Sequence, residues 1–324
     1  MNLLVFSDLH MYNNFSRSYM LETGMTLWVQ NQMKVVDQIK EYGISNKIHM
    51  MIFNGDLFEE RSRIPQDLYN LTWDKFNELS KHFTIIMNTG NHDKTKITNN
   101  SLRPFSSIAT IATEPIDFTS EDTIIRIIPY GMVNDESLKV PDTKHNKILF
   151  THEDINGLTY GHNDCKSQAP LKKELFKDWS LVVNGHIHTP QKMGNIYNIG
   201  SCMKHEFGDE SDRGFIHINN LNIKTIKTES PDFIKIEGLS TRIKNEILKD
   251  DYNFYRIDIS PSELSDTIFT KYNIFPNIIK QNEIKEGRLN NTTTLEDEID
   301  KYIQLSETNL DKNKLKRIGM ELIC

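Results

Sequence analysis

The sequence predicts an α/β protein with a sandwich of sheets at its centre. Apolar runs with the length of buried strands alternate with helical stretches early in the chain and follow one another more closely after that. This order is typical of layered α/β folds. The runs lie at residues 2–7, 47–53, 83–88, 123–129, 147–152, 180–185 and 211–219.

Two early stretches have the apolar periodicity of amphipathic helices. Residues 25–42 repeat apolar side chains at helical spacing. Pro65 suits the first turn of a helix, because its missing N–H needs no partner there, and residues 65–81 then present an apolar face. The apolar face of residues 65–81 is expected to face the core.

The chain is predicted to have three parts. Residues 1–230 hold every motif described below. Residues 231–288 mix short apolar runs with balanced charges and are expected to form a small α/β capping domain. Residues 289–324 begin with the linker-like LNNTTT and continue as a predicted C-terminal helical pair, in which each helix has an apolar stripe.

The composition fits a globular enzyme of a reducing compartment. Of the 324 residues, 37% are hydrophobic and 26% are charged, and no apolar run approaches the ~20 residues of a membrane span. The N-terminal MNLLVFSDLH lacks the basic leader of a signal peptide and is expected to be the first strand. The cysteines, Cys165, Cys202 and Cys324, are isolated in sequence, which favours a cytoplasmic location.

The formal net charge of −7 argues against a surface that binds nucleic acid by bulk charge. It does not exclude a nuclease, because bound metal cations and a local basic patch supply positive charge where it is needed.

Polar motifs follow the ends of five predicted strands. They read SDLH, NGDLFE, TGNHD, THED and NGHIH. The carboxyl ends of strands are where ligand sites form in layered α/β folds, so the five loops are expected to converge on one site. The glycines Gly55, Gly90 and Gly185 permit tight turns and close backbone approach.

These loops hold a mixed set of metal ligands. Alternate residues of a β-like segment point to the same side, so Asp-x-His and His-x-His can each present two groups to one pocket. Imidazoles, carboxylates and an amide together suit Mn, Fe or Zn better than Ca or Mg. Two such ions about 3.5–4 Å apart lower the pKa of a shared water toward roughly 7 and make it a nucleophile for phosphorus. The candidate ligands are Asp8, His10, Asp56, Asn91, His152, His186 and His188.

Each motif alone has a structural explanation. Asn-His-Asp occurs in ordinary turns, His152 suits a strand end, and Gly-His-x-His is enough for a single zinc. Five motifs in this order, each at a strand end, favour a functional site.

The motifs resemble the ordered signature of the calcineurin-like metallophosphoesterase superfamily over residues 1–220. They match as Asp8-Leu-His10, Gly55-Asp56-Leu-Phe-Glu59, Gly90-Asn91-His92-Asp93, His152 and Gly185-His186-Ile-His188. The resemblance implies a four-layer α/β/β/α sandwich and a dinuclear metal centre. It places one metal on Asp8, His10 and His188, the other on Asn91, His152 and His186, and Asp56 between them.

The resemblance also implies catalytic roles around the third motif. His92 is implied to act on the leaving oxygen as general acid or to stabilise the transition state, and Asp93 completes that motif. Glu59 is expected to pair with His92 and raise its pKa.

Within the superfamily, the chain looks most like the DNA double-strand-break repair nucleases, which include the nuclease subunit of bacterial SbcCD and its phage counterparts. The likeness rests on Gly55-Asp56-Leu57-Phe58, His152-Glu-Asp-Ile-Asn-Gly157 and the stretch from Asn198 to Arg213-Gly214-Phe. Cellular members of this branch usually carry histidine where this chain has Glu59, which leaves the balance of exonuclease and endonuclease activity open.

The branch implies a Mn²⁺-dependent DNA exonuclease or endonuclease of recombination and repair. Its capping domain contacts DNA, and its C-terminal helices dock on an ABC-type ATPase; here they could instead pack on their own core. Dimers often form in the branch, and residues 21–42 and 65–81 are the expected dimer helices. Compact length and many Asn, Lys and Ile residues hint at a phage protein, which would act in the host cytoplasm. The alternatives are a phosphodiesterase or phosphatase for small molecules or phosphoproteins, and a non-enzymatic scaffold.

Overall fold

The computed structural model describes most of the chain. The described residues are 1–13, 18–96, 99–120, 122–139, 145–161, 165–279, 295–305 and 311–321. The linker expected at residues 289–294 lies outside them, as does Cys324.

The first sheet contains the three early strands at its centre. Strands β1, β2, β3 and β6 run parallel, while β13 and β14 extend the sheet beside β1 as antiparallel strands. The order is β14-β13-β1-β2-β3-β6. The strands span Asn2–Phe6 (β1), Met50–Phe53 (β2), Thr84–Asn88 (β3), Thr110–Ala112 (β6), Gly214–Asn219 (β13) and Asn222–Lys227 (β14).

The second sheet has a parallel centre between antiparallel edges. Its order is β11-β12-β10-β9-β8-β7, and β12, β10, β9 and β8 are parallel. The strands span Ile116–Ser120 (β7), Thr123–Ile128 (β8), Asn146–Thr151 (β9), Leu181–Asn184 (β10), Gln191–Met193 (β11) and Ile196–Asn198 (β12). A short hairpin, β4 (Lys94–Lys96) with β5 (Asn99–Asn100), stands apart from both sheets.

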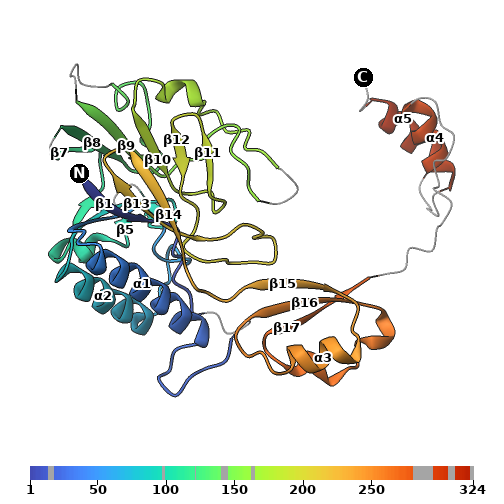
Figure 1. The fold of residues 1–324 in the computed structure, drawn as a ribbon. Helices are drawn as coiled ribbons and strands as arrows, with labels where there is room; N and C mark the ends of the chain where they lie inside the picture. Colours follow the sequence, from blue (N-terminus) through green and yellow to red (C-terminus); the bar gives the residue numbers. More distant parts are fainter. Residues whose placement is uncertain are drawn as a thin grey trace. The chain divides into compact units, whose positions relative to one another are not determined.

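The two sheets face each other across an apolar core. Alternate residues of β1 divide between two layers: Leu3 and Val5 contact the second sheet, while Leu4 and Phe6 pack under the helices. The helices α1 (Leu27–Ser45) and α2 (Gln66–Ser80) lie side by side over the outer face of the first sheet (Figure 1). The early strands are therefore buried on both faces, which explains why they read as continuous apolar runs.

The outer face of the second sheet differs from the expected α/β/β/α sandwich. In the part of the chain that the structure describes, loops and the short 3₁₀ helix η3 (Lys173–Phe176) cover this face. Phe176 and Trp179 supply the bulk that a helix was expected to supply. The mixed α/β character is confirmed, and among the described residues no α-helix lies on this face.

Residues 233–278 form a third sheet with one helix. Strands β15 (Phe233–Glu237) and β16 (Phe254–Ile259) are parallel, β17 (Ile274–Ile278) follows beside β16, and α3 (Thr241–Ile247) connects the first two. The described residues also form the short 3₁₀ helices η2 (Arg103–Ser107), η4 (Pro261–Glu263) and η5 (Thr267–Thr270). Phe233 and Phe254 stack with ring centroids 4.9 Å apart and contact Trp28 of α1. The capping segment thus shares apolar core with the first part of the chain.

The tail forms the expected helical pair. Helices α4 (Leu295–Leu305) and α5 (Lys312–Glu321) contact each other and belong to a separate compact unit.

None of the helices formed by the described residues combines the length and apolar character that a membrane span needs.

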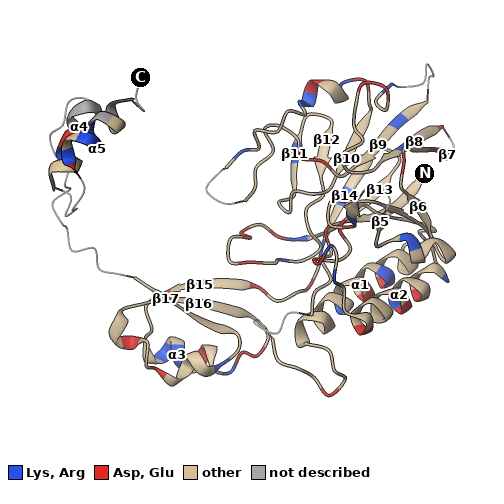
Figure 2. Ribbon diagram, turned by 180° about the vertical axis from the view of Figure 1, so that it is seen from behind, with Lys and Arg blue, Asp and Glu red and all other residues tan. Residues whose placement is uncertain are grey.

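Charges of both signs alternate over α1 and α2 (Figure 2). Asp37 of α1 contacts Lys75 of α2 at 2.9 Å, and Lys40 bridges back to Glu78 at 2.5 Å. These partly exposed pairs add little stability individually, but as a network they set the register of the two helices.

Phe254→Ala is expected to lower the free energy of unfolding of residues 1–277 by about 3–5 kcal/mol, because it removes a buried ring shared by α1 and the third sheet. Urea denaturation followed by tryptophan fluorescence measures this. The control Leu248→Ala removes an exposed side chain and should stay within about 0.5 kcal/mol. An early separate transition with an unchanged main midpoint would instead show that residues 231–288 fold independently.

Candidate metal centre

The predicted ligands gather where five strands end. Strands β1, β2 and β3 of the first sheet and β9 and β10 of the second each stop one to three residues before a candidate ligand. The five loops converge as predicted. They bring together two groups, Asp8 with His10 and His188, and Asp56 with His152 and His186.

The conformation that directs the paired ligands into the pocket differs from the predicted strand alternation. Asp8, His10, Asp56 and His186 all have positive φ, between 46° and 77°, so these segments are kinked rather than strand-like. Left-handed backbone is costly for residues other than glycine, and it persists where the surroundings enforce it, most often at functional sites. Leu9 and Ile187 do turn into the protein body, as expected.

Two glycines make room for the site. A Cβ on Gly90 would lie 2.1 Å from Oδ1 of Asp56, and one on Gly185 would lie 2.6 Å from Nδ1 of His152. Both distances are below any real contact. Glycine is therefore required at these positions by the close approach of the ligands.

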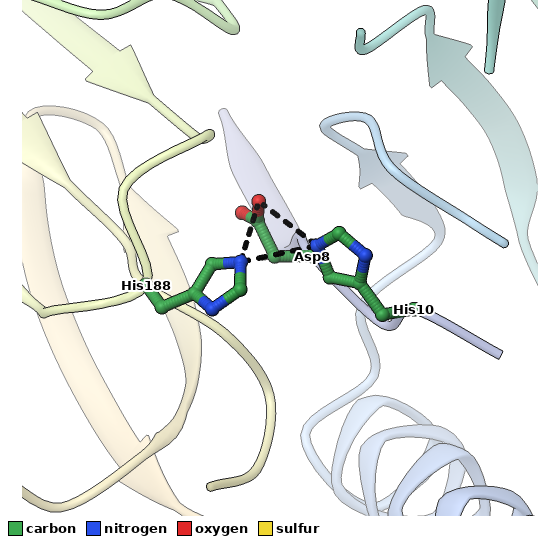
Figure 3. Close-up of side chains that lie close together, drawn as sticks. All are labelled: Asp8, His10 and His188. Carbon is green, nitrogen blue, oxygen red and sulfur yellow. Dashed lines mark hydrogen bonds and ion pairs between the residues drawn. The ribbon is translucent and has the colours of Figure 1, made fainter. Parts of the chain in front are cut away.

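The first group lies between the two sheets. Asp8 Oδ1 is 3.9 Å from Nε2 of His10 and 3.9 Å from Nε2 of His188, and the two Nε2 atoms are 3.1 Å apart. Figure 3 shows both imidazoles directing these nitrogens at one point beside the carboxylate. Two electron-pair donors at this separation suit neighbouring ligands of one cation, since metal–nitrogen bonds of about 2.1 Å place adjacent ligands about 3 Å apart.

The second group has the same character. His152 Nε2 lies 3.1 Å from Asp56 Oδ2, and His186 Nδ1 lies 2.8 Å from Oδ1 of Asn91. Asp56 Oδ2 is also 3.7 Å from His10 Nε2 in the first group. The Asp56 carboxylate therefore faces both groups, while the His92 N–H holds its other oxygen at 2.8 Å.

The Asn91 amide tests whether these residues fit a metal. Its oxygen faces only acceptors, namely His186 Nδ1 and Asp56 Oδ2, and turning the amide over would supply protons to both. The turned amide would also accept from Arg61 at 3.0 Å. A cation among the three acceptors removes the conflict at the Asn91 oxygen without any turn, although the Asn91 nitrogen then still faces the Arg61 guanidinium. The mixed N and O donors suit a transition metal. The residues fit a divalent ion at both positions.

Side chains that sequence reasoning missed hold the ligands in place. The Asn54 carbonyl lies 2.7 Å from Nδ1 of His152, and the Asn54 amide donates to Thr151 of the second sheet at 2.9 Å. Buried Gln32 of α1 donates to the carbonyls of Leu9 and His10. Asn54 stands in the motif already noted, but nothing in the local sequence of Gln32 marks it.

His92, Asp93 and Glu59 lie beside the ligands. The three side chains make different contacts. The ring of His92 lies edge-on to His10 with centroids 4.8 Å apart. The buried Asp93 carboxylate accepts from the N–H groups of Asp56, Leu57 and Gly90, so it fixes the loops that carry ligands. The Glu59 carboxylate is 4.0 Å from His92 but only 2.8 Å from His10.

His205 is a further imidazole of this region that the sequence did not single out. Its ring lies 5.5 Å from His10 and 5.3 Å from His188, and its Nε2 is 3.3 Å from the Asp8 carbonyl. A buried pair of Arg213 and Asp209 holds the His205 backbone.

Burial and mutual charge shift the pKa values of the ligands strongly. Burial alone would raise the pKa of Asp8, but the imidazoles around it, led by His152, lower it to about 2. Burial alone would lower the pKa of His10 and His152. Their carboxylate neighbours instead raise these values to about 10 and about 9. Burial and His152 lower the pKa of His186 to about 4.

Comparison with known families identifies this arrangement. The model of the calcineurin-like phosphoesterases matches residues 1–223, which include every candidate ligand. The chain belongs to the calcineurin-like phosphoesterase family. Members of this family use a dinuclear metal centre, and the two groups of candidate ligands match that arrangement.

Two viral proteins are similar in sequence, and both carry provisional phosphoesterase names. Protein 078R of Invertebrate iridescent virus 3 is 29% identical over 50% of this chain and 50% of its own length. Protein 244L of Invertebrate iridescent virus 6 is 25% identical over 57% of this chain and 70% of its own. The phosphoesterase thus spans about half the length of the first of these relatives.

Three solved structures align with the chain at low TM-scores and low sequence identity. Yfce, a phosphoesterase from E. coli, has a TM-score of 0.38 at 14% identity and aligns over 70% of this chain and 93% of its own. A dimetal phosphatase from Danio rerio has a TM-score of 0.43 at 8% identity, over 67% and 91%. The Pseudomonas putida nuclease MPE has a TM-score of 0.29 at 15% identity, over 51% and 66%.

Mn²⁺ binding is expected to release about two protons at pH 7, because His10 and His152 have raised pKa values and must become neutral to act as ligands. Affinity should therefore rise as the pH increases from about 6 to about 10. Calorimetry in buffers of different ionisation enthalpy measures the release. His82→Gln changes a histidine that follows α2 and should leave it unaltered. Binding heats that do not depend on the buffer would contradict the expected protonation.

Proposed function

We propose that this phosphoesterase is a Mn²⁺-dependent DNA nuclease that hydrolyses phosphodiester bonds. The observation that carries the proposal is an arginine-lined cavity directly beside the second ligand group. The cavity measures about 570 Å³, and Arg61 and Arg103 line it together with Tyr69 and small polar residues. No carboxylate occurs among the described residues that line it.

Arg61 connects this cavity to the centre, because its guanidinium reaches within 3.0 Å of the Asn91 amide. A polymeric diester carries further phosphates on either side of the one being cleaved, and guanidinium groups bind phosphate strongly. A small phosphomonoester has no such neighbouring charge. The cavity therefore favours a nucleic acid over a small substrate, despite the net charge of −7.

In the proposed arrangement, Asp8, His10 and His188 would hold one ion, and Asn91, His152 and His186 would hold the other, with Asp56 facing both groups. Bound divalent ions supply Lewis acidity toward the phosphoryl oxygens and toward an attacking water. The protein supplies fixed ligand directions through the outer contacts described above, including that of His152 with the Asn54 carbonyl.

His92 is the proposed general acid. Its Nδ1 lies 2.7 Å from the Glu59 carbonyl, which makes Nδ1 the donor and leaves Nε2 to exchange a proton with the leaving oxygen. Its backbone N–H is bonded to Asp56. The proton donor and the shared ligand are thereby held together.

His92→Ala is expected to retain Mn²⁺ and to lose about 10²–10⁴-fold in the rate of DNA cleavage, since it removes only proton transfer. Cleavage of single- and double-stranded DNA with Mn²⁺, beside metal analysis of both proteins, checks this, and His82→Ala serves as control. Loss of metal together with activity rescued at high Mn²⁺ would contradict the acid role. Wild-type protein that leaves DNA intact, with and without an ATPase partner, would overturn the nuclease proposal.

The second candidate function is a phosphodiesterase or phosphatase for small molecules or phosphoproteins. The acidic net charge and Glu59 favour it. Rapid turnover of a chromogenic diester or cyclic nucleotide without DNA cleavage would establish it. A non-enzymatic scaffold requires no metal, so elemental analysis without bound metal would favour that third reading.

We also propose that α4 and α5 bind an ABC-type ATPase. Tyr302 and Ile318 of these helices are exposed by 59% and 43% of their surface. Apolar side chains in this state suit insertion into a partner groove. Dimerisation through α1 and α2, contact of residues 231–288 with DNA, a cytoplasmic site of action and a phage origin remain predictions.

Removing residues 293–324 is expected to spare Mn²⁺-dependent diester hydrolysis and to abolish ATPase binding, because every ligand lies before residue 189. Co-purification with the ATPase and a diester assay measure the two effects. Tyr302→Ala in the full chain tests the apolar contact alone. Partner binding that survives the truncation would move the docking site elsewhere.

A further inference from the structure

Glu59 contacts two histidines of the centre through different atoms. Its carboxylate oxygen Oε2 lies 2.8 Å from Nδ1 of His10. Its backbone carbonyl lies 2.7 Å from Nδ1 of His92, whereas the carboxylate is 4.0 Å from that nitrogen. The side chain therefore faces His10, and only the backbone holds His92.

The Nδ1 atom of His10 lies beside this carboxylate. Nδ1 is buried, and among the described residues no acceptor makes a well-aligned hydrogen bond to it. Glu59 Oε2 lies within ion-pair distance of this nitrogen, but not in the geometry of a hydrogen bond. The other ring nitrogen, Nε2, points toward Asp8 and His188. His10 thus has one nitrogen for a cation and the other beside a carboxylate.

The two ligand groups differ in this outer contact. His152, in the second group, has the neutral carbonyl of Asn54 at its Nδ1. A carboxylate behind a ligating imidazole fixes the tautomer and makes the ring a stronger electron donor than a carbonyl does.

We infer that Glu59 is a positioning residue for His10, which strengthens the metal position formed by Asp8, His10 and His188. This departs from the expected pairing of Glu59 with His92. It rests on the proposed ligand role of His10 but not on DNA being the substrate. Replacing the carboxylate should lower the affinity for one ion and leave the affinity for the other unchanged. The backbone contact to His92 should stay in place.

The test is Mn²⁺ binding to the full-length chain, by calorimetry and electron paramagnetic resonance, for wild type, Glu59→Gln and Glu59→Ala. The matched control is Glu60→Gln, which changes the exposed neighbouring carboxylate. Wild type should bind two ions, and the control should bind each of them with the wild-type affinity. Both Glu59 variants should bind one ion about 10–100-fold more weakly and the other unchanged. Glu59 is partly exposed, so the variants should fold, and thermal unfolding monitors this.

Other outcomes overturn the inference. Unchanged binding of both ions with loss of hydrolysis would show that Glu59 acts through His92. An equal loss of affinity for both ions would show that Glu59 supports the whole centre rather than the His10 position alone. A third ion in wild type that Glu59→Gln removes would show that Glu59, His10 and His92 themselves hold a cation. Failure to cleave DNA would contradict the nuclease proposal alone, because the measurements of Mn²⁺ binding do not depend on the substrate.

Discussion

The burial of two carboxylates at the junction of the sheets is the constraint on which the rest of the structure depends. Asp8 and Asp56 are almost fully removed from solvent. Isolated charges in such a place cost several kcal/mol each, and only positive charge with directed contacts offsets the cost. Imidazoles surround both carboxylates, and their pKa values rise accordingly at His10 and His152. The site is therefore organised to hold positive charge, either as protons or as metal cations.

The fold supports this arrangement from all sides. Four ligands occupy left-handed backbone, which local sequence would not adopt unaided. The loops are held there by Asp93, whose carboxylate collects three N–H groups, and by Gln32 of α1. Asn54 joins the ends of the two sheets beneath the ligands. A rigid foundation of this kind keeps the ligand directions independent of loop fluctuations.

Charge is distributed unevenly, and this connects structure with function. The chain is acidic overall, yet the cavity beside Asn91 is lined by two arginines and no described carboxylate. Electrostatic attraction of a phosphodiester therefore has to be local. Glu59 adds a negative charge beside the first ligand group, where it faces His10. The two ligand groups, so alike in composition, thus have different surroundings and need not bind their ions with the same strength.

The sequence by itself determined the order of the early strands, the two covering helices, the family and the set of converging ligands. These follow from apolar periodicity and from motifs at strand ends, which are local signals. Only the tertiary structure decided that the second sheet is covered by loops, that residues 233–278 share core with Trp28, and that Glu59 faces His10. It also decided that left-handed backbone, rather than strand alternation, aims Asp8 and His186 at the pocket. Side-chain direction and contact depend on segments distant in the chain, and no local pattern records them.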